Sequence, residues 1–250
     1  MRRDELTDYL ATYLDAASFE DYCPNGLQVE GAAEVKKIAL GVTASVNMIR
    51  GAVEIGADTI LVHHGIIWRG AHPTYKGGYR ERVRLLLEHD LNLYGFHLPL
   101  DAHPEVGNNV SLARKLGLTD CAPFGAYNGR TIGIRARAGG IDRGELVERV
   151  RRELGREPLA FGAGPERIDS VGIITGGAQG EVLQAIAEGL DAYVTGEVSE
   201  QSFHTAVEEG IHFIAAGHHA TESWGVQSLG AHLAQRFGVE VDFVDVPNPV

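Results

Sequence analysis

Three segments of the chain repeat the same order of features, and this order restricts the fold more than any other property of the sequence. Each runs from a helix end through a glycine into an apolar stretch that closes on polar residues. The segments are AVEIGADTILVHHG, AIAEGLDAYVTGE and AVEEGIHFIAAGHHATE. The glycine spacing alone is common wherever a strand follows a helix in an α/β protein. The three polar endings are more informative, because parallel strands share one carboxyl edge, where open α/β proteins bind ligands.

Helical and strand patterns alternate along most of the chain. Leu6, Leu10, Tyr13 and Leu14 recur at helical spacing, so the first segment is predicted to be a helix. Further strands are expected at 36–44, 58–62, 91–96, 131–140, 169–175 and 239–244, and further helices at 45–56, 80–90, 107–117, 142–155 and 181–189. This alternation predicts an α/β protein with largely parallel or mixed sheets covered by helices.

The chain is long enough for two α/β modules, since it has 250 residues. The alternation of helix and strand patterns is interrupted near residues 122–130, where APFGAYNGR is loop-like. We therefore expect a first module over 1–124 and a second over 125–225. The last helix and the strand VEVDFV, within 226–250, are expected to return to the first module.

Composition and charge exclude several classes of protein. The net charge is −12, which disfavours nucleic acid as a partner, because phosphate contacts need basic residues. The two cysteines, Cys23 and Cys121, are far apart and provide no disulfide framework. The first residues form a charged amphipathic segment that is unlike a signal peptide, and no apolar run reaches the roughly 20 residues of a membrane span. We expect a cytoplasmic protein without a membrane partner.

Eleven histidines are present, and several gather in clusters after the predicted strands. The clusters are His63-His64, the pair His97 and Asp101 in HLPLD, and His218 to Glu222 in GHHATE. The remaining histidines lack such neighbours and are expected to be solvated or structural; they include His72, His89, His103 and His232.

The cluster at 217–222 opens the last helix. Thr221 is predicted to cap the helix, which would leave His218 in the loop and Glu222 in the first turn. Both side chains can then face one point beyond the strand. The helix dipole is an alternative reason for a carboxylate at Glu222, but it does not account for His218.

The other two clusters leave their roles open. Neighbouring strand residues point to opposite faces, so His63 and His64 are expected to serve two metals, or one metal and one contact in the core. Pro99 predicts a shaped turn in place of a helix at HLPLD. His97 fits a ligand, a residue that orients a ligand, or a proton carrier.

Imidazole and carboxylate groups together suit Zn, Mn, Fe or Ni and do not suit Ca. The candidate histidines and carboxylates outnumber the four ligands of one tetrahedral zinc ion. It fits two divalent metal ions about 3.5–4 Å apart with a bridging carboxylate, for which Glu222 is the preferred candidate. A hydroxide held between two such ions would be nucleophilic near neutral pH, which predicts metal-assisted hydrolysis.

These motifs resemble the NIF3-like family, whose bacterial members are named GTP cyclohydrolase 1 type 2 homologues. The resemblance covers nearly the whole chain in order and has the length of the family's short form, without an inserted domain. The matching motifs are NGLQVEG, LVHHG, HLPLD, TGE and GHHATE.

The resemblance implies a specific site, fold and assembly. The dinuclear centre would use His63, His64, Asp101, His218 and Glu222, with Glu222 bridging and His97 in or beside the site; His97 and Glu222 are the expected catalytic residues. The metals would lie near the junction of two α/β modules. The implied assembly is a homohexamer, a trimer of dimers.

Two functions remain as alternatives from the sequence. The first is a metal-dependent hydrolase of the GTP cyclohydrolase type, acting on a nucleotide or a similar small molecule. The second is a non-catalytic metal-handling or scaffold protein whose ring binds a partner. The acidic charge disfavours a third, a DNA-binding regulator.

Overall fold

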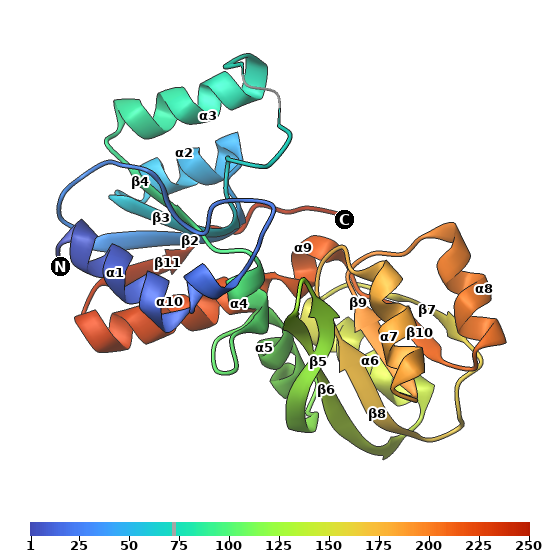
Figure 1. Ribbon diagram of the computed structural model, residues 1–250. Helices are drawn as coiled ribbons and strands as arrows, with labels where there is room; N and C mark the ends of the chain where they lie inside the picture. The colour runs from blue at the N-terminus through green and yellow to red at the C-terminus, as the bar shows by residue number, and fades with distance from the viewer. Residues whose placement is uncertain (72–73) are drawn as a thin grey trace. The chain divides into compact units, whose positions relative to one another are not determined.

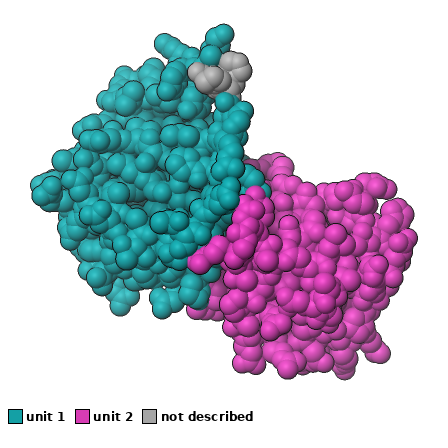
Figure 2. All heavy atoms as spheres, in the orientation of Figure 1, with its two compact units in different colours: residues 1–106, 225–247 teal, residues 107–224, 248–250 magenta. Residues whose placement is uncertain are grey.

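The computed structural model describes the chain except residues 72 and 73, so the prediction for His72 lies outside the described residues. The chain divides into two compact units, coloured separately in Figure 2. Unit 1 contains residues 1–106 and 225–247, and unit 2 contains residues 107–224 and 248–250. Unit 2 thus begins earlier than the boundary expected after residue 124.

Unit 1 is built on a five-stranded sheet with the order β1-β4-β3-β2-β11. β1 runs antiparallel to β4, and the other pairs are parallel. The strands are β1 (Gly26–Val29), β2 (Lys37–Thr43), β3 (Thr59–His64), β4 (Asn92–Gly95) and β11 (Glu240–Phe243). β11 pairs with β2, so the last strand of the chain completes the first sheet.

Helices cover both faces of this sheet (Figure 1). α1 (Arg3–Tyr13) and α10 (Ser223–Phe237) pack on one face, and α2 (Val46–Glu54) and α3 (Gly77–Glu88) pack on the other. β3 serves both, because Leu61 belongs to the core under α1 and α10 whereas Ile60 and Val62 belong to the opposite core. This is the alternation that a fully buried strand requires.

Unit 2 contains a six-stranded mixed sheet with the order β5-β6-β8-β9-β10-β7. Only the β8–β9 and β9–β10 pairs are parallel. The strands are β5 (Thr119–Tyr127), β6 (Arg130–Ile141), β7 (Leu159–Gly162), β8 (Ile168–Ile173), β9 (Ala192–Thr195) and β10 (His212–Ala215). The predicted α/β class with mixed sheets is confirmed.

In the chain, α5 (Asn108–Lys115) precedes the first strand of unit 2, α9 (His218–Thr221) follows its last strand, and α6 (Arg143–Leu154), α7 (Val182–Ala187) and α8 (Glu200–Glu208) lie between strands. α5 and α6 supply buried side chains to the core on one face of the sheet. α7 contacts β9, and α8 contacts β7 and β10. The short α9 follows β10.

The loop expected at 122–130 is wrong, because these residues form the turn end of a β-hairpin, with most of β5 and the first residue of β6. β5 and β6 pair as antiparallel strands, with Tyr127 opposite Arg130. Asn128 and Gly129 make the turn with φ angles of 47° and 77°, as an Asn-Gly hairpin turn requires. Pro123 is tolerated because β5 is an edge strand, where one row of backbone groups needs no partner.

Within the part of the chain that the structure describes, no helix has both the length and the apolar character needed to cross a membrane.

Candidate metal centre

The unit 1 ligand set, defined here as His63, His64, His97 and Asp101, lies at the carboxyl ends of two neighbouring strands. His63 and His64 are the last two residues of β3, and His97 follows β4. Nδ1 of His63 lies 2.9 Å from the carbonyl oxygen of Phe96. A carbonyl only accepts, so Nδ1 carries the hydrogen and Nε2 is left as the ligand nitrogen.

Asp101 completes this part of the set. Its Oδ1 lies 3.5 Å from Nε2 of His63. The expected turn at HLPLD is wrong, because Leu98–Ala102 forms the short helix α4 with Asp101 in its first turn. Pro99 fits there, since the amide hydrogens of the first helical turn need no partner within the helix.

His63 and His64 do not point to opposite sides, contrary to expectation. Their ring centroids are 4.6 Å apart, and ring nitrogens of His63, His64 and His97 all lie within 4.8 Å of one another. His64 is the last residue of β3, so the pleat no longer fixes its direction. Its Nδ1 is 3.1 Å from Oγ1 of Thr43 on the adjacent strand.

Asp21 lies in the segment between α1 and β1 and forms a hydrogen bond with His97. Oδ1 of Asp21 lies 2.8 Å from Nδ1 of His97, and Oδ2 accepts a hydrogen bond from the backbone amide of Leu98. Asn25 accepts from the backbone amide of His97. Burial would raise the pKa of Asp21, but the hydrogen bond and charge of His97 outweigh it and lower that pKa.

The unit 2 ligand set is defined here as His218 and Glu222, at the opposite ends of α9. The predicted cap at Thr221 is wrong, because Thr221 is the last residue of α9 and Glu222 lies between α9 and α10. His218, expected in a loop, is the first residue of α9. The hydroxyl of Thr221 instead accepts from the amide of Gly176 and donates to the carbonyl of His218. This arrangement ties α9 to the loop that follows β8.

His218 lies between two carboxylates. Its Nδ1 is 2.6 Å from Oε1 of Glu197, and its Nε2 is 3.2 Å from Oε2 of Glu222. Burial alone would lower the pKa of His218, but the hydrogen bonds and charges of Glu222 and Glu197 outweigh it and raise the pKa to about 9. Without a metal ion, this imidazole is therefore protonated at neutral pH.

Each unit thus presents an imidazole Nε2 beside a carboxylate oxygen. The separations are 3.5 Å for His63 and Asp101 and 3.2 Å for His218 and Glu222. Two ligands at the usual bond length of about 2.1 Å from one tetrahedral ion lie about 3.4 Å apart. The donor types and these spacings therefore fit a divalent metal such as Zn, Mn, Fe or Ni.

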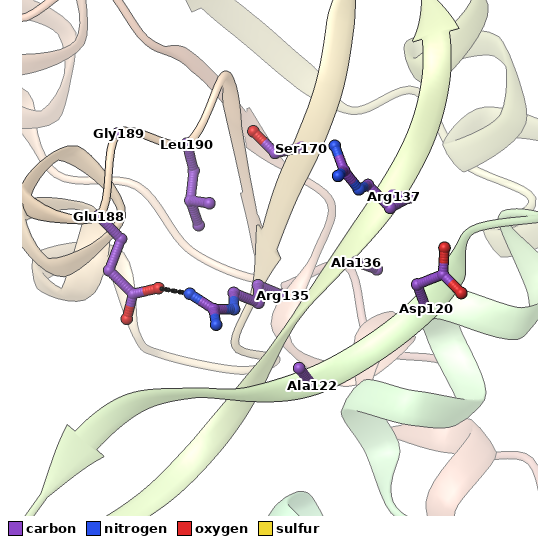
Figure 3. Close-up of a pocket in the computed structure, with 9 residues that line it drawn as sticks. All are labelled: Asp120, Ala122, Arg135, Ala136, Arg137, Ser170, Glu188, Gly189 and Leu190. Carbon is purple, nitrogen blue, oxygen red and sulfur yellow. Dashed lines mark hydrogen bonds and ion pairs between the residues drawn. The ribbon is translucent and has the colours of Figure 1, made fainter.

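A cavity of about 410 Å³ lies on the sheet of unit 2, and none of the candidate ligands lines it (Figure 3). Its charged lining residues are Arg135, Arg137, Asp120 and Glu188. Arg135 is paired with Glu188 at 2.8 Å. Two cations and two acids leave this cavity without a net charge that would select a ligand.

The sequence patterns did not reveal Asp21 and Glu197. Glu197 ends the TGE motif and Asp21 stands just before NGLQVEG, but spacing gave neither a role. Their histidine partners are 76 and 21 residues away, respectively, so no local periodicity connects them. For Glu197, the available signal was its place among the polar residues after β9, because polar residues at the ends of other strands supplied the candidate ligands.

Two of the other histidines are structural, as expected. The rings of His103 and His232 both pack against Tyr13, with ring centroids 4.5 and 4.3 Å from its ring.

Comparison with known proteins identifies the family of this chain. A family model described as Duf34/NIF3 (NGG1p interacting factor 3) matches residues 1–249. A Pseudomonas aeruginosa protein named GTP cyclohydrolase 1 type 2 homolog is 53% identical over 245 residues, which cover 98% of this chain and 97% of that protein.

Solved structures share the whole fold. One, described as protein ybgI of unknown function, has a TM-score of 0.95 at 44% identity and covers 100% of both chains. A crystal structure of a Thermus thermophilus protein has a TM-score of 0.92 at 38% identity, again over 100% of both chains. The resemblance predicted from the motifs is confirmed, and the chain belongs to the Duf34/NIF3 family.

Proposed function

We propose that this protein binds two divalent metal ions and uses them to hydrolyse a nucleotide or a related small molecule. One observation carries the proposal: each unit brings an imidazole Nε2 within 3.5 Å of a carboxylate oxygen. The proposed ligands are His63, His64, Asp101, His218 and Glu222. A dinuclear centre in which Glu222 bridges the ions is part of this proposal.

Bound divalent ions would supply Lewis-acid activation of water and substrate. The protein's own residues then perform the remaining tasks. Asp21 holds the hydrogen of His97 on Nδ1, which leaves Nε2 able to accept and return a proton. The carboxylate of Glu222 places a negative charge beside His218. Thr221 accepts a hydrogen bond from Gly176 and so fixes α9, which positions both residues.

The substrate class comes from the relatives. The Pseudomonas aeruginosa protein is named a GTP cyclohydrolase 1 type 2 homolog, which supports a nucleotide with a hydrolysable ring. We also propose a homohexamer, arranged as a trimer of dimers. Light scattering coupled to size-exclusion chromatography tests the assembly, and a monomer would contradict it.

Elemental analysis of protein loaded with Zn, Mn, Fe or Ni tests the metal centre. We expect two ions per chain in the wild type and fewer in Asp101→Ala and Glu222→Ala. Glu200→Ala is the matched control, because the side chain of Glu200 is exposed and pairs with the exposed His204 at 3.6 Å. Two bound Mn²⁺ ions should also give a spin-coupled electron paramagnetic resonance spectrum that Glu222→Ala removes.

Turnover is tested separately on the metal-loaded protein with nucleotides, phosphoesters and cyclic amides. We expect hydrolysis that chelation abolishes and metal restores, and that is lost in Glu222→Ala but retained in Glu200→Ala. Full metal loading without turnover of any of these substrates would refute the hydrolase and favour the non-catalytic alternative.

A further inference from the structure

Glu197 contacts the nitrogen of His218 that does not face Glu222. The carboxylate of Glu197 is 2.6 Å from Nδ1, whereas Glu222 lies on the Nε2 side. The two nitrogens of an imidazole point away from each other. Glu197 therefore cannot reach an ion that Nε2 binds while it keeps its bond to Nδ1, so its position is that of a residue that orients a ligand.

The chemistry of this contact fixes the form of the ring. An ionised carboxylate only accepts hydrogen bonds, so Nδ1 of His218 must donate. When the ring is neutral, its lone pair is then on Nε2, on the side of Glu222. A carboxylate on the far nitrogen also makes the ligand nitrogen more basic and holds the plane of the ring.

The backbone places Glu197 firmly for this task. The amides of Gly196 and Glu197 both donate to the carbonyl of Gly176, at 2.9 and 3.1 Å. The amide of Gly217 donates to the carbonyl of Gly196 at 2.9 Å. A Cβ at Gly196 would lie 2.6 Å from Cα of His218, so the absence of a side chain there permits this close approach.

We propose that Glu197 is a positioning residue that directs Nε2 of His218 to a metal ion. The proposal rests on the proposed function, because it assigns a task to a residue outside the predicted ligand set. Asp21 stands in the same relation to His97 in unit 1, at 2.8 Å from its Nδ1. Glu197 is the better test, since its side chain is 36% exposed and that of Asp21 only 1%.

The experiment compares Glu197→Gln and Glu197→Ala with Glu200→Gln in the full-length protein. Glu200 is three residues further on, and its side chain is 84% exposed. In the described part of the chain its ion pair is with His204 and not with His218. Affinity for Zn²⁺ is measured by competition with a chromophoric chelator. We expect both Glu197 variants to bind Zn²⁺ about 10–100-fold more weakly, and Glu200→Gln to match the wild type.

Two further readouts separate positioning from a general structural role. Metal-free Glu197→Gln should keep the far-ultraviolet circular dichroism spectrum of the wild type and should still unfold cooperatively. In nitrogen-15 spectra of the metal-free protein, the Nδ1 hydrogen of His218, assigned by its loss in His218→Gln, should exchange with water faster in Glu197→Ala than in the wild type.

Unchanged Zn²⁺ affinity in Glu197→Gln would overturn the proposal, and so would a weakened affinity accompanied by loss of cooperative unfolding. An unchanged Nδ1 signal in Glu197→Ala would also overturn it. These failures differ from that of the proposed function, in which the wild type itself takes up no metal although the Nδ1 hydrogen still depends on Glu197.

Discussion

Single acceptor groups determine which nitrogen each histidine offers. His63, His97 and His218 all have Nδ1 beside an oxygen that can only accept: a backbone carbonyl, Asp21 and Glu197, respectively. Each neutral ring therefore presents Nε2. Nε2 is then the nitrogen that can bind a metal ion on His63 and His218 and accept a proton on His97.

Metal affinity should depend on pH through His218. Its pKa of about 9 means that a metal ion must displace a proton from Nε2 at neutral pH. Apparent affinity is thus expected to rise about tenfold per pH unit below 9 and to level off above it. Chelator competition across this range measures the slope. In His218→Gln the contribution of this proton disappears, and an equal slope there would contradict the assignment.

Gly176 is required beside Glu222. Its φ is +71°, and a Cβ there would lie 2.0 Å from Oε1 of Glu222. Gly176→Ala is expected to cost about 1–2 kcal/mol of stability through backbone strain and to weaken metal binding by displacing the carboxylate. Gly189→Ala is the control, because Gly189 has a φ of +68° and open space around its Cβ. Calorimetry and metal titration should therefore show similar strain in both variants but weaker binding in Gly176→Ala alone.

The sequence predicted the candidate ligands because they follow strands whose pattern is local. The apolar run DTILV places His63 at a strand end without any knowledge of distant residues. Asp21 could not be found in this way, because its role depends on the chain returning to it 76 residues later. The backbone of HLPLD was also mispredicted, since Pro99 is compatible with the first turn of a helix as well as with a loop.

Helices and strands follow the same rule: an element with a local sequence signal was predicted, and an element defined by a distant partner was not. Strands with continuous apolar runs, such as β3 and β8, were predicted from sequence. β1 and β7 were not, because each has four residues and pairs antiparallel at the edge of its sheet. Edge strands bury less surface, so their apolar signal is weak and their identity depends on the partner strand.

β1 is joined to the loop after β3 by its residue Gln28. Its Oε1 accepts from the amides of Ile66 and Ile67, at 2.8 and 3.3 Å. Gly65 and Gly95 leave room for this side chain, because a Cβ on either would lie within 2.8 Å of it. Gln28 thereby holds the loop that continues from His63 and His64.

Replacing Gln28 should loosen that loop without unfolding the sheet. Gln28→Ala removes an acceptor worth about 1 kcal/mol, so hydrogen exchange at Ile66 and Ile67 is expected to accelerate by about tenfold or less. Gln28→Glu retains Oε1 and should keep exchange slow. Mass spectrometry of exchanged peptides measures both. Equal exchange in the wild type and Gln28→Ala would show that another contact holds the loop.

At the scale of the whole molecule, residues 107–224 of unit 2 are inserted in the chain between the two segments of unit 1. The hydrophobic core shared by α5, α6 and the sheet of unit 2 uses only residues between 110 and 216. The core of unit 1 under α1 needs Val226, Leu229 and Leu233 from α10. The two units therefore differ in whether one continuous stretch of chain contains their core.

This difference predicts how fragments behave. Residues 107–224 alone should fold and melt cooperatively, because their core is complete. Residues 1–106 should not, because they lack α10 and β11. Circular dichroism melts of both fragments test this. A cooperative transition for 1–106 would show that α10 is dispensable to unit 1.

The placement of β11 beside β2 also sets an order of events during synthesis. β2 leaves the ribosome long before β11 is made, so the edge of β2 that pairs with β11 stays unpaired while residues 44–239 are translated. Binding partners that shield such an edge, or slow translation before residue 225, would govern the yield of native protein more than any single contact in the finished molecule.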